Sequence, residues 1–169
     1  KLGNTALHFA HSEATVAFLV DDCKLAADSR NTRGESALFV QEHLTLKRRD
    51  FVQTLVQRGL DVNARDQAGR TPLLSAAQFG TPQYCKLLVM LNADLHVTST
   101  DGSNALHFAA SNLDSLWDGE IIHFLLDSRV AVNQTDAQGR TALHKATFSS
   151  ANILLRRGAE IRLDNDGRL

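Results

Sequence analysis

The sequence predicts an all-α repeat solenoid, built from helix-turn-helix units that are joined by short loops resembling β-hairpins. The first observation is a pattern that occurs five times: a glycine, any residue, then Thr, Ser or Asn, then Ala or Pro, then Leu. The five glycines are Gly3, Gly34, Gly69, Gly102 and Gly139. The second observation is their spacing of about 33 residues, a period typical of stacked repeats and not of an isolated loop motif.

The third occurrence indicates how each unit begins. Thr71 can cap a helix with its side chain, and Pro72 suits the first helical position, because no N–H is needed there and its φ is already helical. Leucines and alanines then form an apolar face that lets a neighbouring helix approach closely, and Gly80 ends the helix.

A second helix is expected in each unit. Thr81 and Pro82 repeat the cap and the proline, the apolar positions of residues 84–91 follow the helical period, and Asn92 suits the left-handed conformation that closes the helix. Comparable apolar segments lie at residues 51–56, 121–126 and 153–155. Short extended links follow at residues 60–64, 94–97 and 130–134.

Each helix pair has more apolar surface than it can bury alone, so the copies must stack. We place one domain at residues 1–169, with copies at approximately 1–30, 31–65, 66–98, 99–135 and 136–164 and the start of a further copy at 165–169.

These features resemble the ankyrin repeat, whose consensus is roughly D-x-x-G-x-T-P-L-H-x-A-A, then a V-x-x-L-L-x-x-G helix, then A-x-V-N-A. The resemblance covers essentially the whole chain, and the copy that begins at Asp66 is nearly a full consensus. It implies an ankyrin-repeat solenoid with a concave surface, made of the hairpin tips and the exposed ends of the first helices, on which the family binds partners.

Several copies depart from this pattern. The second has Phe39 in the histidine position and Gln41-Glu42 where two alanines are expected, which puts close packing of its first helix in doubt. The first and fifth copies are short between their two helices. The fourth copy carries an insertion at residues 111–119, which we expect to form a protruding loop.

Composition and charge exclude several classes of protein. Hydrophobic residues make up 43% and charged residues 22% of the 169 residues, as in an ordinary globular chain. The net charge of −1 excludes the strongly basic footprint of a nucleic-acid binder. No apolar run reaches the ~18 residues that span a bilayer, so we expect no membrane insertion and a cytoplasmic or nuclear location.

No residue pattern indicates catalysis, a metal or a cofactor. His8, His107 and His144 follow the leucine of the repeated pattern, and neighbouring repeats about 10 Å apart cannot bring them to one zinc ion. In the family this histidine hydrogen-bonds within and between neighbouring turns. Cys85 holds an apolar helix position, which predicts a buried, inert thiol, and no phosphate loop or nucleophile elbow is present.

The concave surface is the predicted binding site. Arginines dominate the variable positions of the hairpin tips, against Glu35 and Asp101 as the acids that the turns do not explain. They are Arg30, Arg33, Arg65, Arg70 and Arg140. Phe79 and Phe148 are expected to end the first helices of the third and fifth copies, where they either contact a partner or pack against adjacent turns. Arg and aromatic residues are typical of binding hot spots.

The fourth copy adds three candidate binding residues. Ser111 and Asn112 form a polar pair at the end of its first helix, and Trp117 lies in the inserted loop. Because a purely solvated linker does not need a tryptophan, Trp117 either folds back over the helices or anchors a partner.

Asn63 is a candidate for modification. It has Leu55 eight residues upstream, which resembles the context in which ankyrin repeats are substrates of an asparaginyl hydroxylase. The alternative is a structural role, in which its side chain holds the hairpin by hydrogen bonds to the backbone.

The sequence therefore predicts a non-catalytic module that binds a protein or peptide with acidic and apolar residues. The alternative is a regulatory or substrate-positioning segment of a larger enzyme or membrane channel. Both ends of the sequence fall inside a repeat, which suggests one segment of a longer, monomeric chain. A self-associating solenoid is a third possibility.

Overall fold

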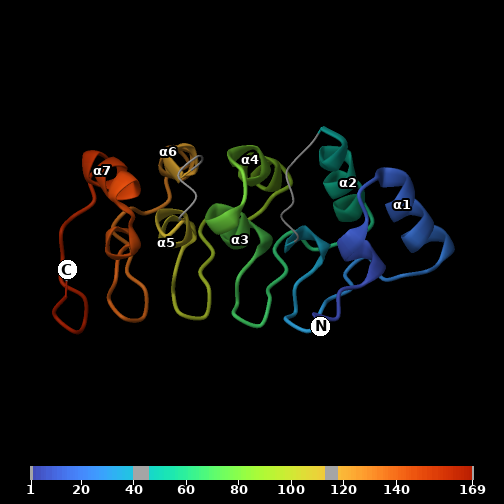
Figure 1. Ribbon diagram of the computed structural model, residues 1–169, viewed down its shortest axis with the longest axis horizontal. Coiled ribbons are helices and arrows are strands. Elements are labelled where there is room, and N and C mark those ends of the chain that lie inside the picture. Colours follow the sequence, from blue (N-terminus) through green and yellow to red (C-terminus); the bar gives the residue numbers. More distant parts are fainter. Residues whose placement is uncertain (1, 40–45, 113–117, 169) are drawn as a thin grey trace.

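The computed structural model describes residues 2–39, 46–112 and 118–168 and forms an elongated stack of helix pairs (Figure 1). An inner row contains η1 (Ala6–Phe9), η3 (Ala37–Phe39), α3 (Pro72–Phe79), α5 (Ala105–Ala110) and η4 (Ala142–Lys145), of which the η elements are 3-10 helices. An outer row contains α1 (Glu13–Ala17) with the π-helical η2 (Phe18–Asp22), α2 (Leu46–Gln57), α4 (Pro82–Met90), α6 (Asp118–Asp127) and α7 (Phe148–Arg156). The described residues contain no strand, so the predicted all-α solenoid is confirmed.

The helices begin where their caps predict. The Thr71 hydroxyl accepts a hydrogen bond from the Leu74 N–H at 3.4 Å, and Pro72 is the first residue of α3. Thr81 and Pro82 start α4 in the same way. Asn92 takes the left-handed conformation after α4, with a φ of 68°. The local rules of helix capping therefore operate as expected in the third copy.

The first helix is reduced to a single 3-10 turn in the first and fifth copies. Two caps define the length of each inner segment: Thr71 and Thr81 in the third copy, but Thr141 and Thr147 in the fifth. The fifth copy is therefore shorter by about one turn of α-helix. The sequence predicted a short connection between two helices, whereas the structure removes the residues from the first helix itself.

The turns that join the copies project from one edge of the stack and form a ladder (Figure 1). Within the third turn the Gly69 N–H donates to the Asp66 carbonyl, with Gly69 at a φ of 70°. Each turn then donates one backbone N–H to a carbonyl of the turn before it, at 2.9 to 3.1 Å. The pairs are Thr32 with Leu2, Gln67 with Arg33, Thr100 with Ala68, Ala137 with Asp101, and Asn165 with Gln138. The turns thus fix the spacing of the copies.

The core lies between the two rows. The leucine of the repeated pattern is fully buried in the first four copies, at Leu7, Leu38, Leu73 and Leu106. Leucines of the outer helices, such as Leu55 and Leu88, are equally buried against them. Leu143, the same leucine in the fifth copy, is only partly buried, because it lies at the C-terminal end of the stack.

Candidate functional site

The concave face is the surface formed by the turns and by the side of the inner row that faces them. Lys145 identifies which helix positions belong to it, because its ammonium group donates to the Ser103 hydroxyl at 2.7 Å and lies 3.0 Å from the Asp136 carboxylate, both in turns. Lys145 is the sixth residue after Gly139. The sixth residue after each of the other pattern glycines has the same position in its copy as Lys145.

Two histidines, His8 and His107, tie their turn to the next one. In the first copy the His8 Nδ1 accepts from the Thr5 N–H, so the ring proton is on Nε2, which donates to the Glu35 carbonyl at 2.9 Å. His107 makes the same pair of contacts, with Asn104 and with the Arg140 carbonyl at 2.9 Å. This is the hydrogen-bonding role that the family resemblance implies for these histidines.

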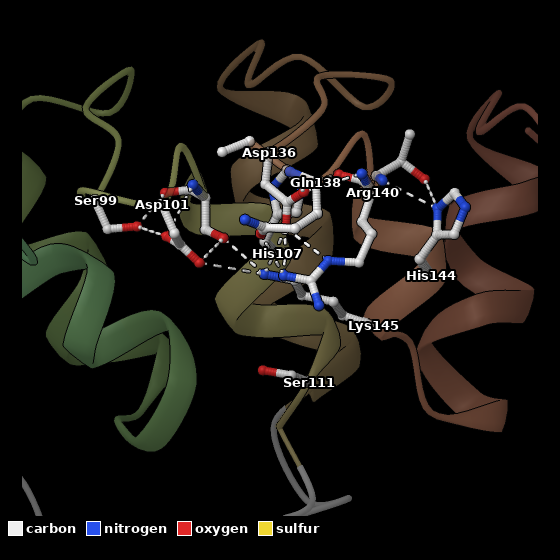
Figure 2. Close-up of polar contacts among 12 residues, drawn as sticks. Ser99, Asp101, His107, Ser111, Asp136, Gln138, Arg140, His144 and Lys145 are labelled. Carbon is white, nitrogen blue, oxygen red and sulfur yellow. Dashed lines mark hydrogen bonds and ion pairs between the residues drawn. The ribbon is translucent and has the colours of Figure 1, made fainter. Parts of the chain in front are cut away.

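Two of the predicted binding arginines hold the carboxylates of their own turns (Figure 2 shows the fifth copy). Arg140 reaches the Asp136 carboxylate at 2.9 Å, and Arg70 reaches Asp66 at 2.7 Å. Both carboxylates are shielded from solvent, with side-chain exposures of 0% and 1%. The other oxygen of each carboxylate accepts two backbone N–H groups of the turn, in Asp136 those of Gln138 and Arg140.

Lys145 completes the charge cluster around Asp136 (Figure 2). Burial alone would raise the pKa of Asp136, but the hydrogen bonds from Arg140 and Lys145 outweigh it and hold that pKa below its ordinary value. Lys145 also lies 3.8 Å from Asp101. Sequence reasoning missed Lys145; comparing the sixth residue after each glycine would have found it, because it is the one cation at that position.

Arg30 and Arg65 brace consecutive turns. The Arg30 guanidinium donates to the Arg65 carbonyl at 2.8 Å and pairs with Asp28, and Arg65 in turn donates to the Thr98 carbonyl at 2.8 Å. Both occupy the position four residues before the glycine of their copy. These contacts give the arginines an intramolecular role in the ladder; their predicted contact with a partner remains untested.

Arg33 differs from the other tip arginines. Its side chain is exposed and makes no hydrogen bond or ion pair with any residue that the structure describes, whereas its backbone N–H donates to Asn31. Arg33 is therefore the tip arginine whose charge is most available to a partner.

The two candidate phenylalanines are both exposed, but only one lies where it was expected. Phe79 ends α3, as predicted, with 64% of its surface exposed. The prediction for Phe148 was wrong: it is the first residue of the outer helix α7, because the fifth copy lacks a full inner helix. Phe148 is 93% exposed, so neither phenylalanine is buried by packing against adjacent turns.

The polar pair of the fourth copy is less accessible than the sequence suggested. Ser111 caps α5 and its hydroxyl donates to the Phe108 carbonyl at 2.9 Å. Asn112 is only 5% exposed, so the expectation that it is presented at the surface was wrong. Trp117 and the tip of the predicted loop lie outside the described residues.

Asn63 links the second copy to the third. Its amide nitrogen donates to the Asn92 carbonyl at 3.1 Å, and its amide oxygen accepts the Asp94 N–H at 2.8 Å. Asn133 forms equivalent bonds with Gly158 and Glu160, which link the fourth copy to the fifth. Asn63 therefore has the structural role that was considered for it, while its hydroxylation remains a prediction.

A shallow apolar pocket of about 220 Å³ lies at the C-terminal end of the stack, lined by Leu143, His144, Leu155, Ile161 and Arg162. The Nε2 atom of His144 is buried there without a hydrogen-bond partner among the described residues. In His8 and His107 this atom donates to the following turn. The end face thus has the chemistry of a surface on which repeats stack.

The described residues can be compared with the requirements of a metal site, a reactive thiol and a membrane span. No group of three or more His, Cys, Asp or Glu side chains is placed to hold a metal ion. Cys85 is fully buried, and burial raises the pKa of its thiol to about 12. Across residues 2–39, 46–112 and 118–168, none of the helices has the length and apolar character to cross a membrane.

The chain belongs to the ankyrin-repeat family. The family described as ankyrin repeats (3 copies) matches residues 42–127 and again residues 73–165. The turns, paired helices and histidine contacts seen in the structure are those that this family resemblance implied.

Similar proteins come from several sources. The chain is 35% identical over 127 residues, or 69% of its length, to the ankyrin repeat protein FPV031 of Fowlpox virus (strain NVSL), covering 36% of that protein. It is 27% identical to the palmitoyltransferase ZDHHC13 of Danio rerio over 91% of its own length and 24% of that protein. It is 28% identical to the palmitoyltransferase AKR1 of Lachancea kluyveri, over 71% of its length and 17% of that protein. The chain thus spans about a third or less of these relatives.

Proposed function

We propose that the chain is a non-catalytic protein-binding module that takes a partner peptide or domain on its concave face. Membership of the ankyrin-repeat family supports this, because repeat solenoids present extended concave surfaces to partners. The observation that carries the placement is Phe79, a large apolar side chain left 64% exposed at the end of an inner helix. Arg33, with its free guanidinium, is available to an acidic residue of the partner.

Affinity capture with matched variants tests this proposal. Phe79→Ala removes the exposed side chain from the inner helix α3, and Met90→Ala removes one of similar exposure, 66%, from the outer helix α4. Charge reversal at Arg70, a predicted binding residue, would not serve as a test of binding, because Arg70→Glu would place a second carboxylate beside the buried Asp66 and disturb the fold. A protein captured from lysate by the parent and by Met90→Ala, but lost with Phe79→Ala, would support the proposal. Equal capture by all three would place the binding surface elsewhere.

A second candidate function is a regulatory or substrate-positioning role within a larger enzyme. The similarity to two palmitoyltransferases, each several times longer than this chain, favours it. Sequencing the full-length transcript tests this candidate. A catalytic segment encoded in the same polypeptide would support it, and a polypeptide composed of ankyrin repeats alone would exclude it.

A further inference from the structure

Three steps of the chain place a glycine directly after an aspartate, at Asp101, Asp118 and Asp166. Such an aspartate can react with its own main chain, because glycine has no Cβ atom to keep the carboxyl carbon away from the glycine nitrogen. The first residue of α6 is Asp118, so the helix holds that step. The other two steps lie at the tips of turns, with Gly102 and Gly167 at φ values of 78° and 77°. These two tips therefore allow a direct comparison.

The carboxylate of Asp101 is held by its own turn (Figure 2). Its Oδ1 atom accepts the Ser99 hydroxyl at 2.5 Å and the Ser103 N–H at 3.2 Å, and its Oδ2 atom accepts the Ser103 hydroxyl at 3.0 Å. Burial alone would raise the pKa of Asp101, but these hydrogen bonds outweigh it and hold that pKa below its ordinary value. Asp101 is thus restrained and kept ionised.

The carboxylate of Asp166 is far less restrained. Its side chain is 68% exposed and forms an ion pair with the exposed Arg168 at 3.4 Å, a kind of contact that holds a side chain weakly. The N–H groups of this turn are bound by Asp164 instead, whose Oδ1 atom accepts those of Asp166 and Arg168. The residue before the glycine is exposed in other turns as well, at Leu2, Arg33, Ala68 and Gln138. Exposure is therefore a property of this tip position.

The two glycine nitrogens are bonded alike, so the carboxyl groups decide the comparison. The Gly102 N–H donates to the Ser99 carbonyl at 3.0 Å. The Gly167 N–H donates to the Asp164 carbonyl at the same distance, 3.0 Å. An attack by either nitrogen has to break one such bond, and this requirement does not distinguish the two turns.

We propose that Asp166 is a modification site, at which the chain converts spontaneously to isoaspartate. The Gly167 nitrogen attacks the carboxyl carbon of Asp166, a C–N bond forms, and the amide proton and the carboxyl OH leave together as water. The product is a five-membered succinimide ring. Water then opens this ring at one of its two carbonyls. Opening at the side-chain carbonyl restores aspartate, whereas opening at the main-chain carbonyl gives isoaspartate, so the water that was lost is regained and nothing is oxidised or reduced.

Isoaspartate changes the turn that contains it, because it adds a CH₂ group to the main chain of residues 164–168. The Asp164 N–H donates to the Arg168 carbonyl at 2.8 Å, across the modified residue. The Asn165 N–H donates to the Gln138 carbonyl of the turn before it, at 3.0 Å. We expect the first bond to be lost and the second, which precedes the modified residue, to remain. The modification thus opens the turn without removing it from the ladder.

Isotope labelling tests the proposal. The folded 169-residue chain is incubated in ¹⁸O-labelled water at neutral pH and then digested with trypsin in ordinary water. Each ring opening adds a labelled oxygen, and electron-transfer fragmentation distinguishes isoaspartate from aspartate. The peptide of residues 163–168 reports on Asp166, and that of residues 87–129 reports on Asp101. Because reaction at Asp101 has to break a hydrogen bond to a charged group, label and isoaspartate should form about tenfold faster at Asp166.

The same chain unfolded in urea is the reference, in which the two sites should react at equal rates. Asp166→Glu is the control variant, because its longer side chain would have to form a six-membered ring, and it should remove the label from the peptide of residues 163–168. Equal rates at Asp101 and Asp166 in the folded chain would overturn the proposal. Label that persists in this peptide after Asp166→Glu would also overturn it. So would a folded chain without isoaspartate at Asp166 after a time in which the unfolded chain has converted.

Discussion

The third and fifth copies begin with the same hairpin turn and differ in the inner helix that follows it. In the third, α3 runs for two turns and ends when the Gly80 N–H donates to the Ala76 carbonyl. In the fifth, η4 is one 3-10 turn. The start of α7 lies close to α5, where the Thr147 N–H and the Ser150 hydroxyl both donate to the Ala110 carbonyl. The repeat therefore depends on its turn, while its inner helix can lose a turn.

The carboxylate of the turn is held differently in the two copies, and this predicts the largest effect. Asp136 is paired with Arg140 and Lys145, whereas Asp66 is paired with Arg70. Asp136→Asn removes the nearest counter-charge of both Arg140 and Lys145 and leaves Lys145 only the more distant Asp101, at 3.8 Å. It should therefore lower the free energy of unfolding by about 3 kcal/mol, and Asp66→Asn by about 2 kcal/mol. Urea denaturation measures both. Adding Lys145→Met to Asp136→Asn should recover part of the loss, and equal losses in the two copies would contradict the prediction.

The pattern glycines of the third and fifth copies should also differ in the stability lost when each is replaced by alanine. A Cβ atom at Gly69 would lie 2.9 Å from the backbone nitrogen of Thr100, whereas at Gly139 the nearest backbone atom is the nitrogen of Asn165 at 3.1 Å and the closer atoms belong to the Asn165 side chain, which can move. Both glycines have a positive φ. Gly69→Ala should therefore cost about 3 kcal/mol and Gly139→Ala about 2 kcal/mol.

Gly59 provides the control for these substitutions, because its φ is 91° but nothing lies within 4 Å of an added Cβ. Gly59→Ala should cost about 1 kcal/mol, the conformational penalty alone. Thermal denaturation of the three variants gives the ranking. If Gly59→Ala proved as harmful as Gly69→Ala, backbone conformation and not contact between copies would account for the loss.

A pH effect should distinguish the fourth copy from the third, in which Leu74 replaces the histidine. Burial lowers the pKa of His107 below 6.5 in the folded protein. The folded state thus favours neutral His107, and this contribution to stability is fully present above pH 6.5 and falls as pH drops through 6.5 towards the lowered pKa. His107→Gln should reduce the loss of stability between pH 7 and pH 5, measured by urea denaturation at each pH. An unchanged pH dependence in this variant would assign the effect to other groups.

The ends of the outer helices predict the smallest effect. After the outer helices of the third and fifth copies, the left-handed residue is Asn92 or Gly158. After the outer helix of the fourth copy it is Arg129, with a φ of 64°. Arg129→Gly should raise the free energy of unfolding by about 0.5 kcal/mol, because relief of the strained conformation exceeds the entropy cost of glycine. Hydrogen exchange of the amides that follow α6 measures this change. Faster exchange in the variant would show that the arginine side chain contributes contacts of its own.

Local chemistry explains which features the sequence could predict. Thr71, Pro72 and Asn92 act within a few residues of themselves, so the caps and ends of the third copy followed from the sequence. The resemblance to the family consensus predicted that the copies stack in a solenoid. The pairing of Arg70 with Asp66 spans four residues and could have been recognised as an ion pair within the turn.

Contacts between copies were beyond such reasoning. Arg30 reaches a carbonyl 35 residues away, and only the stacked structure brings the two together. The position of Phe148 depended on where a missing helical turn is removed, which the sequence does not specify. The contacts of Arg30 and Arg65 with the next turn and the position of Phe148 therefore escaped the sequence for the same reason: both depend on how one copy meets another.

The ladder of turns also gives the molecule a direction. Backbone N–H groups of each turn point back to the preceding copy, whereas the histidine and arginine side chains described above point forward to the following one. The backward contact repeats at each described turn, whereas the forward contact is made by a histidine in some copies and by an arginine in others. Such a chain can gain or lose whole units during evolution by duplication or deletion of gene segments, because any unit that keeps both kinds of contact fits between any two others.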